Sequence, residues 1–299
     1  MEEIEDLNEI EEHYEVLEQV GDGGQGDLFV GRERKSGRKV ALKIQKEREF
    51  ESENYFRDLA NELDAEGTHA RELARIPGIP NLFARGHYGS RRCIVMEFVE
   101  GTLLFDLLAS ARPFKVATVA SVIGQLCEIL DAVHRSGLVH RDVKPENVMV
   151  EPDGRIRLLD LGLAIRARKK TDRGCGTIGY APPEQLDANP KGVTPQADIF
   201  ALGCMLLEMT VMQLPYSGAR RRAAQDCPVL PPERLAKIPA EFTPLALRMV
   251  ERELWRRPVD VREVFADLRP HLPSLGSRRP AKPLRPDPTE YYRTRRPTL

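Results

Sequence analysis

Short apolar stretches separated by turn residues dominate the first hundred residues of the chain. From Tyr14 to Gln45, apolar residues recur at short intervals and are interrupted by a glycine cluster and then by Ser36-Gly37. This pattern predicts three antiparallel strands joined by two turns. Cys93 to Val99 is a short apolar stretch that predicts a buried strand, and Glu100-Gly101 after it predicts a turn at a boundary between two parts of the chain.

Helical spacing is found once before this boundary and repeatedly after it. Phe56 to Ile76 contains no proline and carries apolar residues near helical spacing, which predicts one amphipathic helix. Val148 to Val150 and Ile156 to Leu159 flank Asp153-Gly154, which predicts a β-hairpin. Further helices are predicted around Leu126 to Val133 with Gly137 as terminator, over Ile199 to Thr210, over Thr243 to Arg252 with Thr243 as N-cap, and over Val259 to Leu268.

The composition is ordinary for a globular protein and gives no reason to expect a nucleic-acid or membrane partner. Of the 299 residues, 41% are hydrophobic and 30% are charged, and the formal net charge is -1. The longest apolar run, Ile199 to Leu207, is too short to span a membrane, and no apolar stretch follows a basic start at the N-terminus. The five cysteines are scattered without a Cys-x-x-Cys pair, so they predict neither a disulfide framework nor a zinc site, and they favour the reducing cytoplasm.

The two ends of the chain differ in charge. Residues 1–12 carry six Glu and one Asp without any Lys or Arg, whereas residues 277–299 are rich in arginine. Residues 273–299 are also rich in proline and lack a core pattern. We therefore expect an acidic N-terminal tail over residues 1–13 and a disordered tail, or a linker, over residues 273–299.

One short stretch, His140-Arg141-Asp142-Val143-Lys144-Pro145-Glu146-Asn147, combines a carboxylate, a cation and an amide. These groups suit phosphoryl transfer, in which Asp142 orients the attacking hydroxyl, Lys144 offsets charge on the transferring phosphate and Asn147 helps to hold magnesium. Asp160, which precedes Leu161-Gly162 at the end of the predicted hairpin, is a second candidate metal ligand. The alternative interpretation of the stretch is a charged surface turn.

A glycine pattern, Gly21-x-Gly23-x-x-Gly26, lies between two predicted strands and not at the start of a helix. Glycines at such a turn let backbone N–H groups approach phosphate oxygens, and Lys43 at the end of the next strand is a candidate phosphate contact. A glutamate of the predicted Phe56 to Ile76 helix is expected to reach Lys43. Among the candidates Glu62, Glu66 and Glu72 we favour Glu66, because Leu63 and Ala70 place it beside the buried face.

Taken in order, these motifs resemble the eukaryotic-like protein kinase family, and bacterial serine/threonine kinases within it. The resemblance rests on the glycine pattern, Lys43, the His140 to Asn147 stretch, Asp160-Leu161-Gly162, Ala181-Pro182-Pro183-Glu184, Asp198 to Gly203 and Arg257-Pro258. It covers about residues 14–272. It implies an α+β, two-lobed fold, with a small antiparallel β N-lobe and one helix over residues 14–99, a larger and mainly α-helical C-lobe over residues 100–272, and an ATP site between them.

The resemblance also implies roles for single residues. Asp142, Lys144, Lys43 and Glu66 would be the catalytic set, and Asn147 and Asp160 would hold two magnesium ions, for which manganese is an alternative. Glu184 and Arg257 would form a structural pair, and Asp198 would brace the catalytic loop. The residues implied to bind ATP are Gly21, Gly23, Gly26 and Lys43 at the phosphates, Met96 and Glu97 to Val99 beside the adenine, and Leu28, Ala41 and Met149 above and below it.

The implied activity is ATP-dependent transfer of the γ-phosphoryl group to serine or threonine hydroxyls of protein substrates. Lys144 favours the serine/threonine branch of the family over the tyrosine branch. A pseudokinase scaffold and a small-molecule phosphotransferase are the alternatives. Leu161 stands where phenylalanine is usual, Leu28 replaces the usual valine, and Pro183 adds a proline to the Ala-Pro-Glu signature, but none of these departures removes a catalytic group.

Regulation by phosphorylation is a further hypothesis. Thr171 lies among basic residues in the segment between Asp160 and Glu184, and Arg141 is the usual receiver of a phosphate in that segment. We expect autophosphorylation at Thr171, with self-association as a possible route. Thr177 is expected near Asp142, where it would help to recognise the serine or threonine acceptor.

Overall fold

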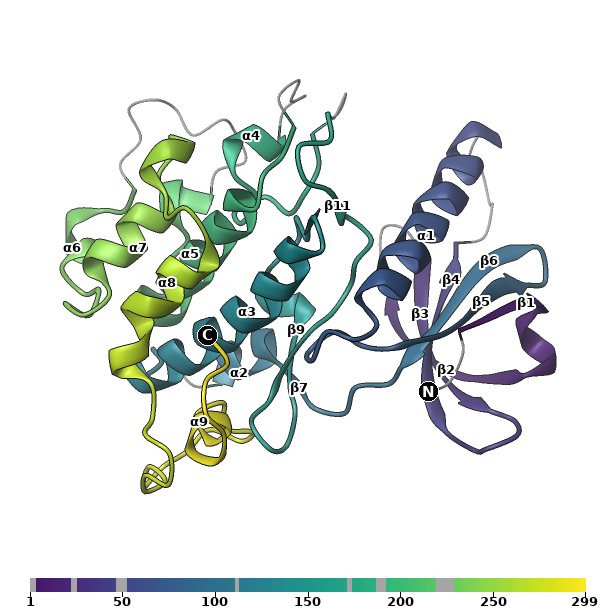
Figure 1. Cartoon of the computed structure of the whole chain (residues 1–299), viewed down its shortest axis with the longest axis horizontal. Coiled ribbons are helices and arrows are strands. Elements are labelled where there is room, and N and C mark those ends of the chain that lie inside the picture. The colour runs from purple at the N-terminus through teal and green to yellow at the C-terminus, as the bar shows by residue number, and fades with distance from the viewer. Residues whose placement is uncertain are drawn as a thin grey trace. The chain divides into compact units, whose positions relative to one another are not determined.

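The computed structural model describes residues 4–22, 26–46, 53–110, 113–170, 174–186, 192–218 and 229–299, with residues 53–56 described by their backbone only. Contacts within the chain divide it into two units, residues 1–99 and residues 100–299. The first unit is rich in strands and the second is mainly helical, and Figure 1 labels the elements of both. This agrees with the hydrophobic pattern of the sequence.

A six-stranded sheet with the order β1-β5-β6-β4-β3-β2 forms the first unit. The strands β2 (Tyr14–Asp22), β3 (Gly26–Glu33) and β4 (Lys39–Gln45) are the three antiparallel strands predicted by the apolar pattern. The strands β5 (Leu82–Tyr88) and β6 (Arg91–Glu97) also pair antiparallel, and β6 contains most of the predicted buried strand. Leu42, Ile44 and Val95 from this sheet are fully or almost fully buried in one core.

Helix α1 (Glu53–Leu73) packs against β4, β5 and β6. Leu59, Leu63, Ala70 and Leu73, the apolar positions that predict the helix, are all buried. Each buried leucine contributes about 1.5–3 kcal/mol relative to an exposed one, so this stripe fixes which face of the helix meets the sheet. The predicted helix is confirmed, with both of its ends three residues earlier than expected.

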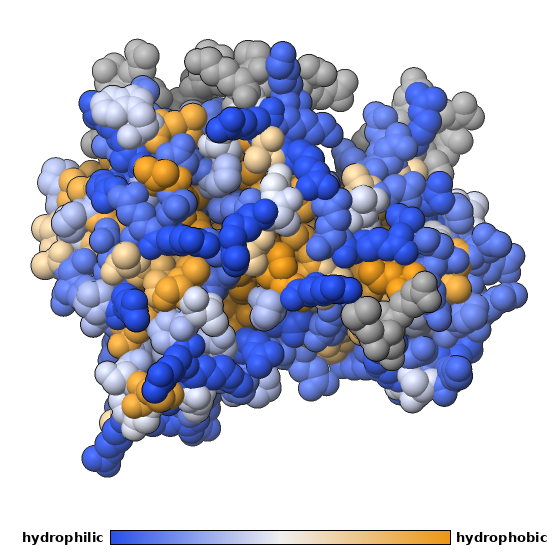
Figure 2. Space-filling view, in the orientation of Figure 1, coloured by the Kyte–Doolittle hydropathy of each residue, from blue (hydrophilic) through white to orange (hydrophobic). Residues whose placement is uncertain are grey.

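The acidic N-terminal segment is not a tail throughout, which corrects the expectation from composition. Strand β1 (Glu5–Glu9) pairs parallel with β5, and the 3-10 helix η1 (Ile10–Glu12) places Ile10 in the core with no exposed surface. The acidic side chains of β1 remain mostly exposed, and that part of the first unit shows a mainly hydrophilic surface in Figure 2. An exposed edge strand needs no alternation of apolar residues, so the sequence carried no strand signal there.

Two small sheets and several helices build the second unit. The strands β7 (Thr102–Leu103), β9 (Val148–Val150) and β10 (Ile156–Leu158) form one sheet in the order β10-β9-β7, and β8 (Leu138–Val139) pairs with β11 (Ile165–Arg166). The helices among the described residues are α2 (Leu104–Ser110), α3 (Val116–Arg135), α4 (Pro183–Leu186), α5 (Gln196–Val211), α6 (Pro232–Leu235), α7 (Thr243–Met249), α8 (Val261–Leu268) and α9 (Glu290–Thr294). The 3-10 turns are η2 (Pro145–Asn147), η3 (Pro215–Gly218), η4 (Leu254–Arg256) and η5 (Arg269–His271).

Helices α3 and α5 form the centre of the second unit. Nearly all residues of α5 are buried, and α3 packs against α5, α8 and β10. Among the described residues, α3 alone is long and apolar enough to pass a length-and-composition test for a membrane span, but 72% of its most apolar window is buried inside the protein. Burial against other helices accounts for its apolar character.

The starts of two helices differ from the sequence prediction. Thr243 is the first residue of α7 and not its N-cap, which is Phe242, and the Thr243 hydroxyl donates to the carbonyl oxygen of Pro239. Helix α8 begins at Val261, and the Asp260 carboxylate accepts hydrogen bonds from the backbone N–H groups of Arg262 and Glu263. Asp260 therefore caps α8, and the helix begins two residues later than the predicted start.

The C-terminal segment is ordered, which corrects the expectation of a disordered tail over residues 273–299. Helix α9 lies beside α3, and Tyr292 is 1% exposed and donates its hydroxyl hydrogen to Glu128 of α3. Burial raises the pKa of Tyr292, so its hydroxyl keeps its proton as a hydrogen-bond donor. A few anchor residues on an otherwise polar segment suffice for docking and leave no periodic apolar pattern in the sequence.

Candidate active site

The loop from His140 to Asn147 is held by a carboxylate that comes from a helix far along the chain. Asp198 on α5 has no exposed surface and accepts hydrogen bonds from the backbone N–H groups of His140 and Arg141, over 2.9 and 2.8 Å. Arg141 has a φ of 71°, in the left-handed region that a side chain with a Cβ rarely adopts. The two hydrogen bonds to Asp198 offset the cost of this conformation, so the predicted bracing role of Asp198 has a direct geometric basis.

His134 on α3 fixes Asp198 in turn. Its Nε2 lies 2.8 Å from the second carboxylate oxygen, the one that also accepts from His140. Burial alone would raise the pKa of Asp198, but the hydrogen bond from His134, the nearby His134 and His140 rings and the backbone N–H of Arg141 together lower it below the usual value for aspartate. Asp198 is therefore an ionised anchor for the loop.

Asp142 lies at the centre of a cluster of polar side chains. The Thr177 hydroxyl donates to its Oδ1 over 2.7 Å, and the Asn147 amide donates to its Oδ2 over 2.9 Å. Lys144 Nζ lies 2.9 Å from Oδ2 of Asp142 and donates to the Thr177 hydroxyl over 2.7 Å. The loop and Thr177, which lies 35 residues beyond Asp142, therefore form one connected network. The expected position of Thr177 near Asp142 is confirmed.

The two predicted metal ligands, Asn147 and Asp160, lie at the two ends of the β9–β10 hairpin, and backbone pairing in the hairpin brings these ends together. Asn147 immediately precedes β9, and its carbonyl oxygen accepts a hydrogen bond from the N–H of Leu159 over 2.8 Å. Asp160 follows with a φ of 59°, and its Oδ1 accepts a hydrogen bond from the N–H of Gly162. Leu161 is 5% exposed, so the apolar residue after Asp160 packs inward as predicted.

The donor set at the ends of this hairpin fits magnesium. Nδ2 of Asn147 donates hydrogen bonds to Asp142. The amide oxygen of Asn147 is therefore the atom that can bind a cation. Asp160 contributes carboxylate oxygens, and hard oxygen donors are what magnesium prefers. No group of three or more His, Cys, Asp or Glu side chains suited to a metal occurs in the described part of the chain.

Within the first unit, Lys43 and Glu66 form the ion pair that the sequence predicts. Lys43 Nζ on β4 lies 2.7 Å from Oε2 of Glu66 on α1, and the two residues are 8% and 2% exposed. The other two candidates, Glu62 and Glu72, are exposed on the same helix. The choice among the three glutamates is therefore resolved by position on the helix face.

The glycine pattern is only partly described, because Gly23 lies outside the described residues. Gly21 is in β2 and Gly26 is in β3. A Cβ on Gly26 would come within 2.7 Å of the carbonyl oxygen of Ile44, closer than real Cβ atoms approach a neighbour. Glycine at 26 is therefore required for the close pairing of β3 with β4, whatever contact it makes with a nucleotide.

Most of the residues expected around the adenine lie in strands. Leu28 pairs with Lys43 across β3 and β4, and Ala41 pairs with Met96 across β4 and β6. The N–H of Glu97 donates to the carbonyl oxygen of Asn81, which immediately precedes β5. Val99 is 8% exposed at the end of the first unit, and Met149 is a half-buried residue of β9 in the second unit.

Glu184 and Arg257 form the predicted structural pair. The guanidinium group donates to both carboxylate oxygens, over 2.7 and 3.0 Å, and the Arg257 side chain has no exposed surface. Arg257 also donates to the carbonyl oxygens of Glu251, Gln196 and Arg252. This network fixes α4, and with it the segment that carries Thr177.

Sequence reasoning missed two residues that position the loop. His134 bonds Asp198, and Gln185 donates from Nε2 to the carbonyl oxygens of Arg141 and Cys175 over 2.6 and 3.2 Å. Gln185 follows Glu184 in a recognised motif, but no local pattern distinguishes it from a surface glutamine. Its role depends on Arg141, 44 residues earlier, and is visible only in the folded chain.

Comparison with known proteins identifies relatives of this chain. A protein kinase domain family model matches residues 14–263. A probable serine/threonine-protein kinase of Clostridium perfringens is 30% identical over 273 residues, which cover 85% of this chain and 38% of that protein. The serine/threonine-protein kinase PknL of Mycobacterium tuberculosis is 30% identical over 272 residues, covering 87% of this chain and 65% of PknL. The probable serine/threonine-protein kinase PknB of Lactococcus lactis is 28% identical over 272 residues, covering 86% and 42%. The chain thus spans less than two thirds of the length of these relatives.

Proposed function

The chain belongs to the protein kinase domain family, and we propose that it is a serine/threonine kinase that transfers the γ-phosphoryl group of ATP to hydroxyls of protein substrates. The observation that carries this proposal is the network of Asp142, Lys144 and Thr177. It combines a carboxylate that can orient a hydroxyl with a cation that can meet a phosphate. The names of the relatives support the same activity.

Asp142 orients the acceptor in this proposal. Oδ1 accepts a hydrogen bond from the Thr177 hydroxyl in the structure, and an acceptor hydroxyl of a substrate would bind the same carboxylate. Asn147 holds the opposite oxygen, so the carboxylate plane cannot rotate freely. The carboxylate thus accepts the proton of the substrate hydroxyl while the hydroxyl oxygen attacks the γ phosphorus of ATP and the bond to the leaving ADP oxygen breaks.

Lys144 stabilises negative charge on the transferring phosphoryl group. Its ammonium group lies between Asp142 and Thr177, which keeps it within the site instead of in solvent. Asn147 and Asp160 would hold magnesium, which would neutralise charge on the phosphates of bound ATP. Manganese has the same preference for oxygen donors and is the alternative ion.

Nucleotide binding is proposed for the residues that the family resemblance implies. Lys43, oriented by Glu66, would hold the α and β phosphates, and Gly21, Gly23 and Gly26 would cover them. The N–H of Glu97 is bonded to the carbonyl oxygen of Asn81, so Glu97 would contact the adenine through its own carbonyl oxygen. Val99 would contact the adenine through its N–H. Leu28, Ala41, Met96 and Met149 would supply the apolar surfaces for the adenine.

Autophosphorylation of the segment after Asp160 is the proposed form of regulation. Thr171 lies outside the described residues, but Lys169 and Lys170 before it are exposed. Arg141 is 8% exposed, and no partner for its Nε is found among the described residues. A phosphate on Thr171 would give this guanidinium group a partner, and two copies of the chain would associate for the transfer.

Four described cysteines are free thiols, which supports a reducing cytoplasmic setting.

One assay tests the function. The purified chain is incubated with ATP labelled at the γ position, magnesium and a mixture of protein substrates, in parallel with Asp142→Ala. We expect label on serine and threonine of protein in the first sample and a loss of at least a hundredfold in the second. Equal labelling in both samples would refute the proposal, and label confined to a small metabolite would assign the chain to another class of phosphotransferase.

A further inference from the structure

The C-terminal segment contacts the turn of the β9–β10 hairpin at several points. The carbonyl oxygen of Asp287 lies so close to Gly154 that a Cβ on this glycine would clash with it. Nη2 of Arg295 lies 2.9 Å from an Asp153 carboxylate oxygen. The hairpin turn is therefore packed against residues more than 130 positions later in the sequence.

Gln125 of α3 joins the same two segments from the buried side. It is 3% exposed, and its Nε2 donates to the carbonyl oxygens of Gly154 and Pro288, over 3.1 and 3.3 Å. Its Oε1 accepts a hydrogen bond from the N–H of Ile156 over 2.8 Å. One side chain thus satisfies backbone groups of the hairpin and of the C-terminal segment together, so loss of the segment would leave part of this network unsatisfied.

The C-terminal segment is itself anchored on α3. Tyr292 is buried and bonds Glu128, whose other carboxylate oxygen accepts a hydrogen bond from the hydroxyl of Thr298. Asp287 and Thr289 are also buried, and Thr289 donates from its N–H and its hydroxyl to the Asp287 carboxylate. These contacts make the segment a fixed support.

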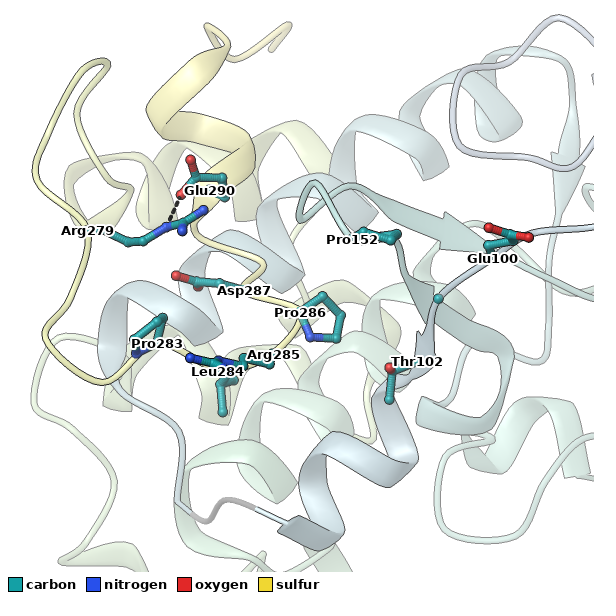
Figure 3. Close-up of a pocket in the computed structure, with 11 residues that line it drawn as sticks. Glu100, Thr102, Pro152, Arg279, Pro283, Leu284, Arg285, Pro286, Asp287 and Glu290 are labelled. Atoms are coloured by element: carbon teal, nitrogen blue, oxygen red, sulfur yellow. Dashed lines mark hydrogen bonds and ion pairs between the residues drawn. The ribbon is translucent and has the colours of Figure 1, made fainter.

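The support is concentrated at the hairpin turn. A cavity of about 650 Å³ remains beside the contact, lined by Gly101 and Thr102 on one side and by the Pro283 to Asp287 stretch on the other. Figure 3 shows Pro152 of the hairpin turn across from Pro286, and the Arg279–Glu290 ion pair on the far side of the C-terminal segment. The C-terminal segment does not fill this cavity. It therefore supports the hairpin mainly through the contacts at Asp153 and Gly154.

We propose that residues 283–298 are a strap that holds the β9–β10 hairpin and thereby positions Asn147 and Asp160 for the metal–nucleotide complex. Asn147 and Asp160 adjoin the two strands, and the bond between the Asn147 carbonyl oxygen and the Leu159 N–H closes the hairpin at that end. The strands of this hairpin have three residues each and β7 adds only two more to their sheet, so support at the turn restricts motion at the other end. This inference rests on the proposed role of Asn147 and Asp160, and it makes Tyr292 and Gln125 positioning residues.

Two measurements on full-length Tyr292→Ala test the strap. The first is amide hydrogen exchange over residues 148–159, for which we expect exchange at least tenfold faster than in the unchanged chain, with α5 and α8 unaffected. The second is calorimetric titration with a non-hydrolysable ATP analogue. We expect a several-fold higher Kd with magnesium present and an unchanged Kd without it. Neither measurement needs catalysis. An inactive chain would refute the proposed function, and these two measurements would still show whether the strap holds the hairpin.

Matched variants complete the test. Tyr292→Phe keeps the buried ring and should retain most of the protection, whereas Arg296→Ala at an exposed position of the strap should change neither measurement. Should Tyr292→Ala fail to fold, Asp153→Lys replaces it in the test, because this substitution reverses one charge of an exposed ion pair. We expect it to shift both measurements in the same direction. Adding Arg295→Asp to it should restore both. Unchanged hairpin exchange, equal loss of protection throughout the second unit, or a Kd change that does not depend on magnesium would overturn the proposal.

Discussion

The Thr177 hydroxyl donates a hydrogen bond to Oδ1 of Asp142 over 2.7 Å. Asp142 is in the loop braced by α5, whereas Thr177 belongs to the segment that leads into α4. The bond therefore links the proposed catalytic carboxylate to the segment expected to meet the protein substrate. Loss of the hydroxyl at 177 should affect the positioning of the carboxylate and of Lys144 together.

Thr177→Ala is expected to lower kcat/KM for a protein substrate about tenfold, the effect of losing one charge-assisted hydrogen bond of about 1.4 kcal/mol. Thr177→Ser is the matched control, since it keeps the hydroxyl and should retain most of the activity. Steady-state kinetics with a fixed peptide substrate provide the measurement. Equal losses in both variants would show that the methyl group matters and the hydrogen bond does not.

Glu66→Gln is expected to lower kcat/KM by about thirtyfold, or about 2 kcal/mol, because Lys43 then loses a buried anionic partner. Glu62→Gln on the exposed face of the same helix removes one negative charge as well and should leave activity within about twofold. Activity of the two variants is compared at saturating and at limiting ATP. Similar losses in both would contradict the assignment of Glu66 as the specific partner.

Asp198 should make stability depend on pH in the acid range. Its folded-state pKa is lowered, so its ionised form stabilises the fold above the unfolded-state pKa of about 3.9, and this contribution is lost as the pH falls through the lower folded-state value. Asp198→Asn should be less stable at pH 7, and the gap between the two proteins should narrow as the pH is lowered below about 4. Urea unfolding at a series of pH values measures the gap, and a constant difference at all pH values would be inconsistent with an ionised Asp198.

Arg257→Met should destabilise the chain by about 3–5 kcal/mol, because it leaves the Glu184 carboxylate without its bidentate partner. Arg248 pairs with Glu263 at the surface, and Arg248→Met should cost less than about 1 kcal/mol. Chemical denaturation of both variants gives the comparison. A small effect of Arg257→Met would mean that the carbonyl groups around it find other donors.

The sequence predicts the central features because their determinants are local. Lys43 lies in an apolar strand, and the helical spacing of Leu63 and Ala70 directs Glu66 toward the core, where it meets the lysine. The turn chemistry of Asp153-Gly154 likewise specifies the β9–β10 hairpin. Periodicity and turn residues act over a few positions, so they can be recognised without knowledge of the rest of the fold.

The features that the sequence did not predict depend on distant partners. Gln185 acquires its role from the Arg141 carbonyl, and Tyr292 from a position on α3. At the other end of the chain, β1 forms because β5 offers an open edge, even though the acidic residues of β1 have low strand propensity. In each case tertiary contacts override a local signal that is weak or points elsewhere.

The bonds from His140 and Arg141 to Asp198 also constrain when the loop can form. The partners are 58 and 57 residues apart, so the loop cannot adopt its left-handed Arg141 conformation until α5 has been synthesised and has closed that distance. Closing such a long loop carries an entropic cost that is recovered only after the helix is in place. The braced conformation of the loop therefore forms only once α5 is in place, although α5 follows both α3 and the hairpin in the chain.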